Sequence, residues 1–352
     1  MRPMLIIDGS QGEGGGQILR SSLTLATILT QPITIENIRA KRKTPGLAAQ
    51  HLTAVRAAAQ ICAATVSGAE LGSTRLTFIP QSQPIAGDYY FNVAEARMGG
   101  SAGAATLVIQ TILLPLVLAQ GKSRVIVEGG THVEWSPSYH YLHNTFLPML
   151  TYLGVTVQAE LLAWGWYPAG QGKIELNIPG SAELKLNNVS RWTQRGRLKQ
   201  IHGLGVAANI AAHIAQRLVD QAKRLLEPLA VPLVIEPQRV KSVSPGAGIF
   251  LVAEYESSYA GFSALGRIGK SSEQVAEAAV HELLRFHRSA GVLEPHLTDQ
   301  LILPLALTRQ AITVSSESLS LHTITNIAVI SQFLGPIAQV DEANQLIHFR
   351  PS

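Results

Sequence analysis

A glycine-rich stretch near the start of the chain pairs a flexible backbone with one carboxylate. Residues 8–17 read DGSQGEGGGQ and lie between a strand-like segment and a helical pattern. Glycines let backbone N–H groups approach an anion, and the start of a helix adds partial positive charge. Because Glu13 would repel a phosphate unless a divalent cation lay between them, a role for Glu13 in binding Mg²⁺ is one hypothesis. A tight turn with a solvated Glu13 is the other.

Basic side chains gather at a later strand-to-helix turn. Residues 39–47 read RAKRKTPGL, and Arg20 lies on the preceding predicted helix. Closely spaced guanidinium and ammonium groups suit a polyphosphate, which arginine binds through paired N–H donors. A solvated basic loop is the alternative, because most charge runs are simply exposed.

His322 stands at the start of a predicted helix, within SSESLSLHTITN at residues 315–326. The positive end of a helix disfavours imidazolium, which keeps the ring neutral and nucleophilic near neutral pH. The same end would attract a phosphate bonded to the ring. A structural role is the alternative for a lone histidine.

Two other segments could line a nucleotide site. Residues 296–300 (HLTDQ) begin a predicted helix, where their polar side chains would otherwise form a plain N-cap. Residues 129–137 (GGTHVEWSP) form a loop after a predicted strand. Trp135 and Pro137 of this loop either face a nucleobase or pack inward.

The elements that must position these residues alternate between strands and helices. Period-two and short apolar runs predict strands at 4–7, 33–38, 65–70, 75–78, 89–92, 123–128, 155–161, 173–178, 311–314, 337–340 and 345–349. Apolar residues at helical spacing predict helices at 17–29, 46–64, 102–118, 139–152, 298–307 and 323–333. The order predicts a mixed α/β (α+β) fold of three repeated βαβαββ units, the third a partial copy.

A more charged stretch interrupts the third unit. Between about residues 184 and 288 the spacing of elements changes, and basic residues cluster in the first part of the stretch. We therefore expect residues 1–184 and 289–352 to form one large domain, and residues 185–288 to form a smaller inserted domain.

Composition limits the class of protein. The chain has 352 residues, 46% of them hydrophobic and 15% charged, which excludes a disordered chain or a coiled coil. Its 28 basic and 24 acidic residues give a net charge of +4, which permits an anionic partner without requiring one. A single cysteine, Cys62, fits a reducing, cytoplasmic location. The most apolar run, residues 104–119, is too short to span a bilayer, so no membrane partner is expected.

Taken together, these segments resemble the RNA 3′-terminal phosphate cyclase family over nearly the whole chain. The likeness is carried by residues 8–20 (DGSQGEGGGQILR), 38–40 (IRA), 43–47 (KTPGL), 50–54 (QHLTA), 165–170 (GWYPAG), 297–300 (LTDQ), and by His322 with residues 325–327 (TNI). The resemblance implies three βαβαββ modules with an inserted α/β domain.

The resemblance also implies a reaction, in which an RNA 3′-terminal phosphate becomes a 2′,3′-cyclic phosphodiester at the expense of ATP, with Mg²⁺ or Mn²⁺. The histidine that matches His322 attacks the α-phosphorus of ATP, releases pyrophosphate and carries AMP as a phosphoramidate. AMP then passes to the RNA 3′-phosphate, and the neighbouring 2′-OH displaces it.

By position, the resemblance assigns roles to individual residues. Glu13 matches the metal-binding acid and His322 the nucleophile. The residues expected around the phosphates are Arg20, Arg39, Arg42 and Gln50. Those expected elsewhere in the nucleotide site are Gln110, His296, Leu297, Thr298, Asp299 and Gln300. Pro137 is expected beside the adenine, with Phe262 on its other face.

The chain departs from the family pattern at three positions. Where many relatives carry aspartates, it has His132 and His140, and at His296 relatives can carry Tyr. These changes bear on substrate details and on metal or pH preference. RNA with a 3′-terminal phosphate is the expected partner, and the sequence leaves open whether the chain forms a homodimer.

Two rival classes share this architecture. Non-catalytic cyclase-like proteins of RNA binding and ribosome assembly lack the nucleophilic histidine, and carboxyvinyl transferases need no covalent histidine. His322, Glu13 and the basic cluster together favour the enzyme over the first class.

Overall fold

The computed structural model describes residues 2–98, 100–187 and 189–351 as a mixed α/β fold with four small sheets. The first sheet has the order β1-β2-β4-β3, and β1 and β2 are parallel while the other pairs are antiparallel. Its elements in chain order are β1 (Leu5–Asp8), α1 (Gly16–Leu29), β2 (Ile33–Glu36), α2 (Ala49–Ile61), β3 (Thr65–Ser67) and β4 (Leu76–Ile79).

The second sheet has the corresponding order, β5-β6-β8-β7, with the same strand directions. Its strands are β5 (Asp88–Asn92), β6 (Ser123–Gly129), β7 (Gln158–Ala163) and β8 (Gly172–Ile178). Its helices are the 3₁₀ turn η1 (Val93–Ala96), α3 (Ala105–Leu118), α4 (Tyr139–Tyr141), the π-helical η2 (Leu142–Phe146) and α5 (Leu147–Thr151). The helix expected at 139–152 is thus divided by a π-helical segment, which a period of 3.6 does not predict.

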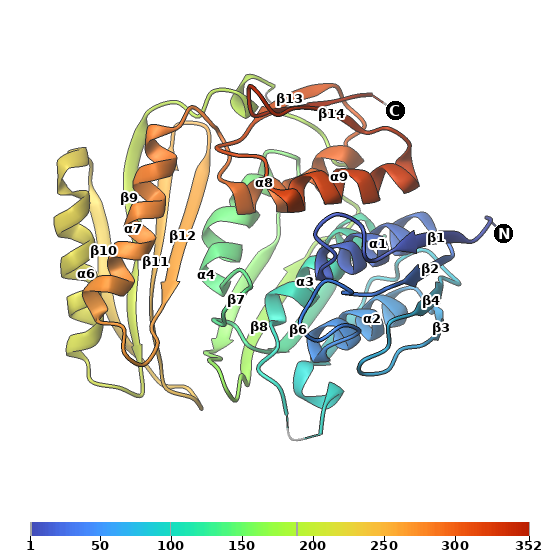
Figure 1. Ribbon diagram of the computed structural model, residues 1–352, viewed down its shortest axis with the longest axis horizontal. Coiled ribbons are helices and arrows are strands. Elements are labelled where there is room, and N and C mark those ends of the chain that lie inside the picture. The colour runs from blue at the N-terminus through green and yellow to red at the C-terminus, as the bar shows by residue number, and fades with distance from the viewer. Residues whose placement is uncertain (1, 99, 188, 352) are drawn as a thin grey trace.

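The third sheet, near the C-terminus, is three-stranded and antiparallel, with the order β13-β15-β14. Its elements are α8 (Pro295–Leu307), β13 (Ile312–Ser315), α9 (Leu321–Leu334), β14 (Ala338–Asp341) and β15 (Leu346–Phe349). A parallel bridge joins Leu293, just before α8, to Ser316. Helix α9 packs on both α8 and α1, so the end of the chain lies against its beginning (Figure 1).

The fourth sheet, with the order β10-β9-β11-β12, contains the residues between the second and third sheets. Its elements are η3 (Ser190–Trp192), β9 (Leu198–Ala208), α6 (His213–Leu226), η4 (Glu227–Leu229), β10 (Leu233–Val240), β11 (Gly246–Tyr255), β12 (Tyr259–Leu265) and α7 (Ser272–Arg288). Helices α6 and α7 pack on each other and on the strands, around their own apolar core. β12 is the strand of this sheet that stands nearest the rest of the chain, beside α4 (Figure 1).

The largest core explains how the helices are held. Helix α3 is apolar all round and almost wholly buried, as expected for a helix surrounded by others. It packs against α1 and α2, and the same core continues through α8 and α9. Cys62 is free and buried. In the described residues no helix is long and apolar enough to cross a membrane.

Candidate functional site

The glycine-rich loop lies against the first turns of α9. Gly12 has a φ of +55°, and a Cβ there would stand 2.0 Å from Thr325 Oγ1. The backbone N–H of Glu13 donates to the same oxygen over 3.2 Å. A glycine at position 12 is therefore required both by the backbone conformation and by the close approach of α9.

This contact brings Glu13 beside His322. Glu13 Oε1 lies 3.5 Å from His322 Nδ1, while Oε2 is ion-paired with Arg42. The Glu13 side chain is 8% exposed and that of His322 46%. Glu13 Oε1 is buried and accepts no hydrogen bond from the described residues, so a carboxylate oxygen without a donor faces the ring.

Asp299 holds the start of α9 in place. Ser320 caps the helix, and its Oγ accepts from the N–H of Thr323 over 3.0 Å. Asp299 Oδ1 accepts from Ser320 Oγ over 2.8 Å and from Thr323 Oγ1. Burial raises the pKa of Asp299, although those two hydroxyls and the charges of His322 and His296 act to lower it. The carboxyl thus anchors the turn that presents His322.

Three arginines surround the loop. Arg20 on α1 has its Nε buried without a partner among the described residues. Burial lowers the pKa of Arg20 to about 10, against the attraction of Glu13. Arg39 donates to the carbonyl of Gly46 over 2.7 Å, and burial lowers its pKa, with Arg42 nearby acting in the same direction. An unsatisfied buried guanidinium donor next to other cations is an arrangement that an anion would relieve.

His51, on α2, belongs to the same cluster and was not singled out from the sequence. Its Nδ1 accepts from the N–H of Ala48 over 3.3 Å, and a Cβ on Gly16 would lie 2.5 Å from its Nε2. Burial lowers the pKa of His51 to about 3, helped by Arg39, Arg20 and Arg42. The ring is therefore neutral, with its Nε2–H at the start of α1. In the sequence, His51 was marked only as part of the segment 50–54, which carries the family resemblance.

A second group of predicted residues meets between α1, α3, α8 and α9. Gln110 Nε2 donates to Gln300 Oε1 over 2.8 Å, and both line a cavity of about 30 Å³ together with Arg20. Asn326 ties the helices together, because its Oδ1 accepts from Ser21 over 2.6 Å and its Nδ2 donates to the carbonyl of Asp299 over 3.0 Å. This bridging role could not be inferred from helical spacing.

The residues at the start of α8 divide into two kinds. His296 is exposed, but Leu297 lies in the core and Thr298 is buried with its hydroxyl bonded to Ser316 and to the carbonyl of Glu294. The side chains of Leu297 and Thr298 therefore support the helix. Its N-cap is Glu294, which accepts from the N–H groups of His296 and Leu297 over 2.7 and 2.8 Å.

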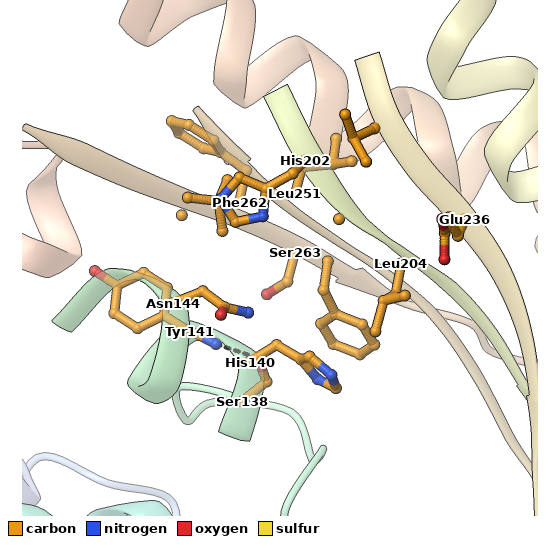
Figure 2. A pocket seen from close by; sticks show the side chains of 15 residues that line it. Ser138, His140, Tyr141, Asn144, His202, Leu204, Glu236, Leu251, Phe262 and Ser263 are labelled. Carbon is orange, nitrogen blue, oxygen red and sulfur yellow. Dashed lines mark hydrogen bonds between the residues drawn. The ribbon is translucent and has the colours of Figure 1, made fainter. Parts of the chain in front are cut away.

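A larger cavity of about 250 Å³ lies between α4 and the strands of the fourth sheet (Figure 2). Ser138, the residue after Pro137, lines it, and so does Phe262. The carbonyl of Pro137 accepts from Thr106 Oγ1 over 2.7 Å, which fixes this loop on α3. Phe262 also packs on Phe286 in the core of the fourth sheet, with ring centroids 5.8 Å apart.

Tyr141 connects this cavity to the start of α8. It lines the cavity, and its hydroxyl donates to Glu294 Oε1. A chain of contacts therefore runs from the cavity through Glu294 and α8 to Asp299, and from there to the turn that carries His322. Gln50 lies apart from this chain, and its Oε1 accepts from the N–H of Ala104 at the start of α3 over 2.8 Å.

Glu13 is the residue of this site to test as a ligand for a divalent metal. Within the described ranges no three His, Cys, Asp or Glu side chains cluster as a metal site. The unpartnered Glu13 Oε1 is nevertheless a suitable donor, because Mg²⁺ is usually held by one or two carboxylates and by substrate phosphates. A single carboxylate oxygen fits a metal whose other ligands come from a bound phosphate.

Known proteins are similar to this chain over nearly its full length. The sequence profile described as RNA 3′-terminal phosphate cyclase matches residues 11–340. A protein of Trichormus variabilis with the name "RNA 3′-terminal phosphate cyclase" is 50% identical over 345 residues, covering 98% of both chains. Proteins of the same name from Nostoc sp. and Methylococcus capsulatus are 49% and 47% identical, covering 98% and 96% of this chain and 98% and 92% of their own.

Proposed function

The chain belongs to the RNA 3′-terminal phosphate cyclase family and is an enzyme with that activity, and we propose that His322 is its nucleophile toward ATP. The observation that carries the proposal is the position of His322 at the start of α9, 3.5 Å from Glu13 and beside the glycine-rich loop. A histidine in the rim of a polar site, rather than in the core, is free to reach a phosphorus atom.

Glu13 sets the form of the ring in this proposal. A carboxylate facing Nδ1 favours the tautomer with the proton on Nδ1, which leaves the lone pair of Nε2 available. His322 Nε2 then attacks the α-phosphorus of ATP, the bond to pyrophosphate breaks, and a phosphorus–nitrogen bond to AMP forms. Splitting the reaction in this way replaces one difficult displacement with easier ones.

The arginines and the loop receive the phosphates. Arg20, Arg39 and Arg42 supply positive charge, and the N–H groups at the start of α1 and α9 add donors. Glu13 Oε1 would hold Mg²⁺ or Mn²⁺ together with phosphate oxygens, and the metal would neutralise the charge that develops on them. Asp299 keeps the His322 turn in position through Ser320 and Thr323.

The later steps involve the RNA end. An oxygen of the RNA 3′-phosphate displaces His322 from the AMP phosphorus, and the ring nitrogen regains its lone pair. The neighbouring 2′-OH then attacks the 3′-phosphorus, loses its proton and expels AMP, closing the ring. This last step is intramolecular, so proximity assists it strongly. DNA lacks the 2′-OH and could be adenylylated but not cyclised.

We assign the base of ATP to the 250 Å³ cavity. It adjoins Pro137 through Ser138, it includes Phe262, and Tyr141 connects it to α8 and so to the His322 turn. Apolar walls with a few polar groups are typical of a site for a small planar ligand. Gln110 and Gln300 would contact the part of the nucleotide between the cavity and the phosphates.

The architecture supports three βαβαββ modules, at 1–184 and 289–352, with an inserted domain at 185–288. The matching strand order of the first two sheets supports the repeat, and the third sheet corresponds to a module without its first strand. The separate core of the fourth sheet supports the insertion. RNA with a 3′-terminal phosphate is the proposed partner; a cytoplasmic location and a homodimer stay predictions.

The decisive experiment is labelling with ATP that carries radioactive α-phosphate. We expect an acid-labile protein–AMP adduct in the wild type and none in His322→Ala. His213→Ala is a matched control, because His213 is another exposed histidine at the start of a helix, α6. An adduct that persists in His322→Ala would refute this nucleophile, and a wild type that never labels would favour the non-catalytic class.

A further inference from the structure

Two histidines at the edge of the large cavity form a hydrogen-bonded pair that the reaction described above does not use. His132 Nε2 lies 2.9 Å from His140 Nδ1, and His132 Nδ1 lies 2.8 Å from Thr131 Oγ1. The His132 ring stacks on Trp164 and Trp166, with centroids 4.4 and 5.1 Å away. Both histidines are buried, so their protons are fixed by these few contacts.

The hydroxyl of Thr131 has two acceptors within reach, His132 Nδ1 and the carbonyl of Gly165. Thr131 Oγ1 itself accepts from the N–H of Gly165 over 2.9 Å. The carbonyl of Gly165 is 3.4 Å away and already accepts from the N–H groups of Thr131 and His132, each over 3.0 Å. Since a carbonyl oxygen has two lone pairs, both are occupied. His132 Nδ1, the nearer of the two acceptors at 2.8 Å, is therefore the better partner for the hydroxyl of Thr131.

The rest of the pair follows from this bond. If His132 Nδ1 accepts, a neutral His132 carries its proton on Nε2 and donates it to His140 Nδ1. His140 must then carry its own proton on Nε2. Burial lowers the pKa of His132 well below its ordinary value and lowers that of His140 to about 4. A second proton on His140 would also place two N–H groups face to face, so both rings are neutral near pH 7.

The other ring nitrogen of His140, Nε2, takes no part in the histidine pair. His140 lines the cavity and His132 does not (Figure 2). Because Nδ1 is directed at His132, Nε2 is the polar atom of His140 that is left for a ligand. Among the described residues His140 makes no hydrogen bond through Nε2. Phe250 stacks on the ring, with centroids 5.0 Å apart, and holds its plane.

We propose that His140 is a specificity-determining residue of the nucleotide site, which donates a hydrogen bond from Nε2 to a ring nitrogen of the base. The inference rests on the proposed placement of the base in this cavity. Adenine offers N1, N3 and N7 as acceptors, and each would pair with a fixed N–H donor. His132 and Thr131 are positioning residues, because they fix the His140 proton without touching the ligand.

The first test compares ATP with 1-deaza, 3-deaza and 7-deaza ATP in the adduct assay. One analogue should show a KM raised roughly 3- to 10-fold, the range of one net hydrogen bond, with little change in kcat. His140→Ala should raise the KM for ATP by the same factor and abolish the preference for ATP over that analogue. His140→Gln, which returns an N–H near the same place, should restore part of it.

His143→Ala is the control, because His143 lies nearby on η2 but is exposed and stacks on Tyr139. It should leave the analogue series unchanged. If the wild type uses all three analogues as well as ATP, or if His140→Ala keeps the preference, the proposal is wrong. Either result would still come from an enzyme that forms the adduct, so it differs from a failure of the proposed function, in which no adduct forms.

The second test does not depend on a variant that folds. Nitrogen-15 shifts of the imidazoles in the wild type distinguish protonated from unprotonated ring nitrogens. We expect His140 to have a bare Nδ1 and a protonated Nε2, and His132 to have the same tautomer. A His140 with its proton on Nδ1 would overturn the proposal, since Nε2 could then only accept.

Discussion

The His322 site and the His132–His140 pair use the same side chain in opposite environments. The side chain of His322 is 46% exposed, and a carboxylate lies 3.5 Å from its Nδ1. His132 and His140 are buried and have aromatic rings and each other as neighbours. A nearby carboxylate leaves the charge of a ring adjustable, whereas burial without a counter-charge keeps it neutral.

This contrast separates a reacting group from a recognising one. A nucleophile must gain and lose a bond, so it needs access and a partner that tolerates a change of charge. A hydrogen-bond donor for recognition must keep one proton in one place, which burial and a fixed tautomer provide. If the two regions are correctly assigned, changes near His322 should affect the chemistry, and changes near His140 should affect selectivity.

The largest effect that sharpens this contrast is expected from Glu13→Gln. The amide keeps the shape but removes the charge that faces His322 Nδ1 and the oxygen offered to a metal. Adduct formation should fall by about 10²- to 10⁴-fold, the range found when an acid–base partner is lost. The measurement is the single-turnover rate of protein adenylylation, with the melting temperature as a check on folding.

Glu317→Gln is a closely matched control for this change. The Glu317 side chain is 7% exposed against 8% for Glu13, each is paired with an arginine, and each has one buried oxygen without a hydrogen bond. Its partner Arg285 lies on α7. Adenylylation in Glu317→Gln should stay within about twofold of the wild type. Equal losses in both variants would mean that Glu13 acts only through folding.

A smaller effect is expected from Gly12→Ala, which disturbs the loop that carries Glu13. Alanine at a φ of +55° costs about 1 kcal/mol, and its Cβ would collide with Thr325 Oγ1. Overpacking adds about 1–3 kcal/mol to this backbone cost, so we expect the loop to shift rather than keep the collision. Because the loop carries Glu13, adenylylation should then fall at least about tenfold.

Gly72→Ala separates the two causes, because Gly72 has a φ of +78° but open space around its Cβ position. Chemical unfolding should show a loss of about 1 kcal/mol in Gly72→Ala, with adenylylation unchanged. If Gly12→Ala behaved in the same way, the contact between the loop and α9 would not be what positions Glu13.

The sequence predicted the local elements well, because period-two and helical patterns are local. The strands and helices expected for the first two units lie within a few residues of those found. The π-helical segment at Leu142–Phe146 was missed, since one extra residue in a turn leaves no mark on an apolar pattern. The third sheet lacks the first strand of a module, and the sequence pattern likewise predicted no strand at that place.

The candidate site was predictable as a set of residues but not as a geometry. Glu13 and His322 are 309 positions apart, and only the packing of α9 on α1 brings them together. The His132–His140 bond depends on a loop, a short helix and two tryptophans from another strand end, so spacing could not show it. The bridging role of Asn326 was missed because a polar residue in an apolar helix pattern is compatible with many roles. Glu294 was missed because it lies outside the helix expected at 298–307 and caps one that begins earlier, at Pro295.

The smallest expected effect concerns Glu294, which lies between the two regions through Tyr141 and α8. Burial raises the pKa of Glu294 from its ordinary 4.5 to about 7, although His296, Tyr141 and two backbone N–H groups act to lower it. Between these two values the folded protein binds more protons than the unfolded chain. Its contribution to stability is therefore greatest at low pH and declines as the pH rises toward 7.

Glu294→Gln removes this titration. The difference in free energy of unfolding, wild type minus variant, should decline by up to about 1.4 kcal/mol per pH unit from pH 4.5 to 7 and level off above it. Urea unfolding of both proteins at several pH values measures it, and all other titrating groups cancel in the difference. Parallel curves would mean that Glu294 is as well solvated in the folded protein as in the unfolded chain. Glu294, which links the cavity to the His322 turn through Tyr141 and α8, would then be open to water. The contrast between a buried region around His140 and an accessible one around His322 would no longer hold.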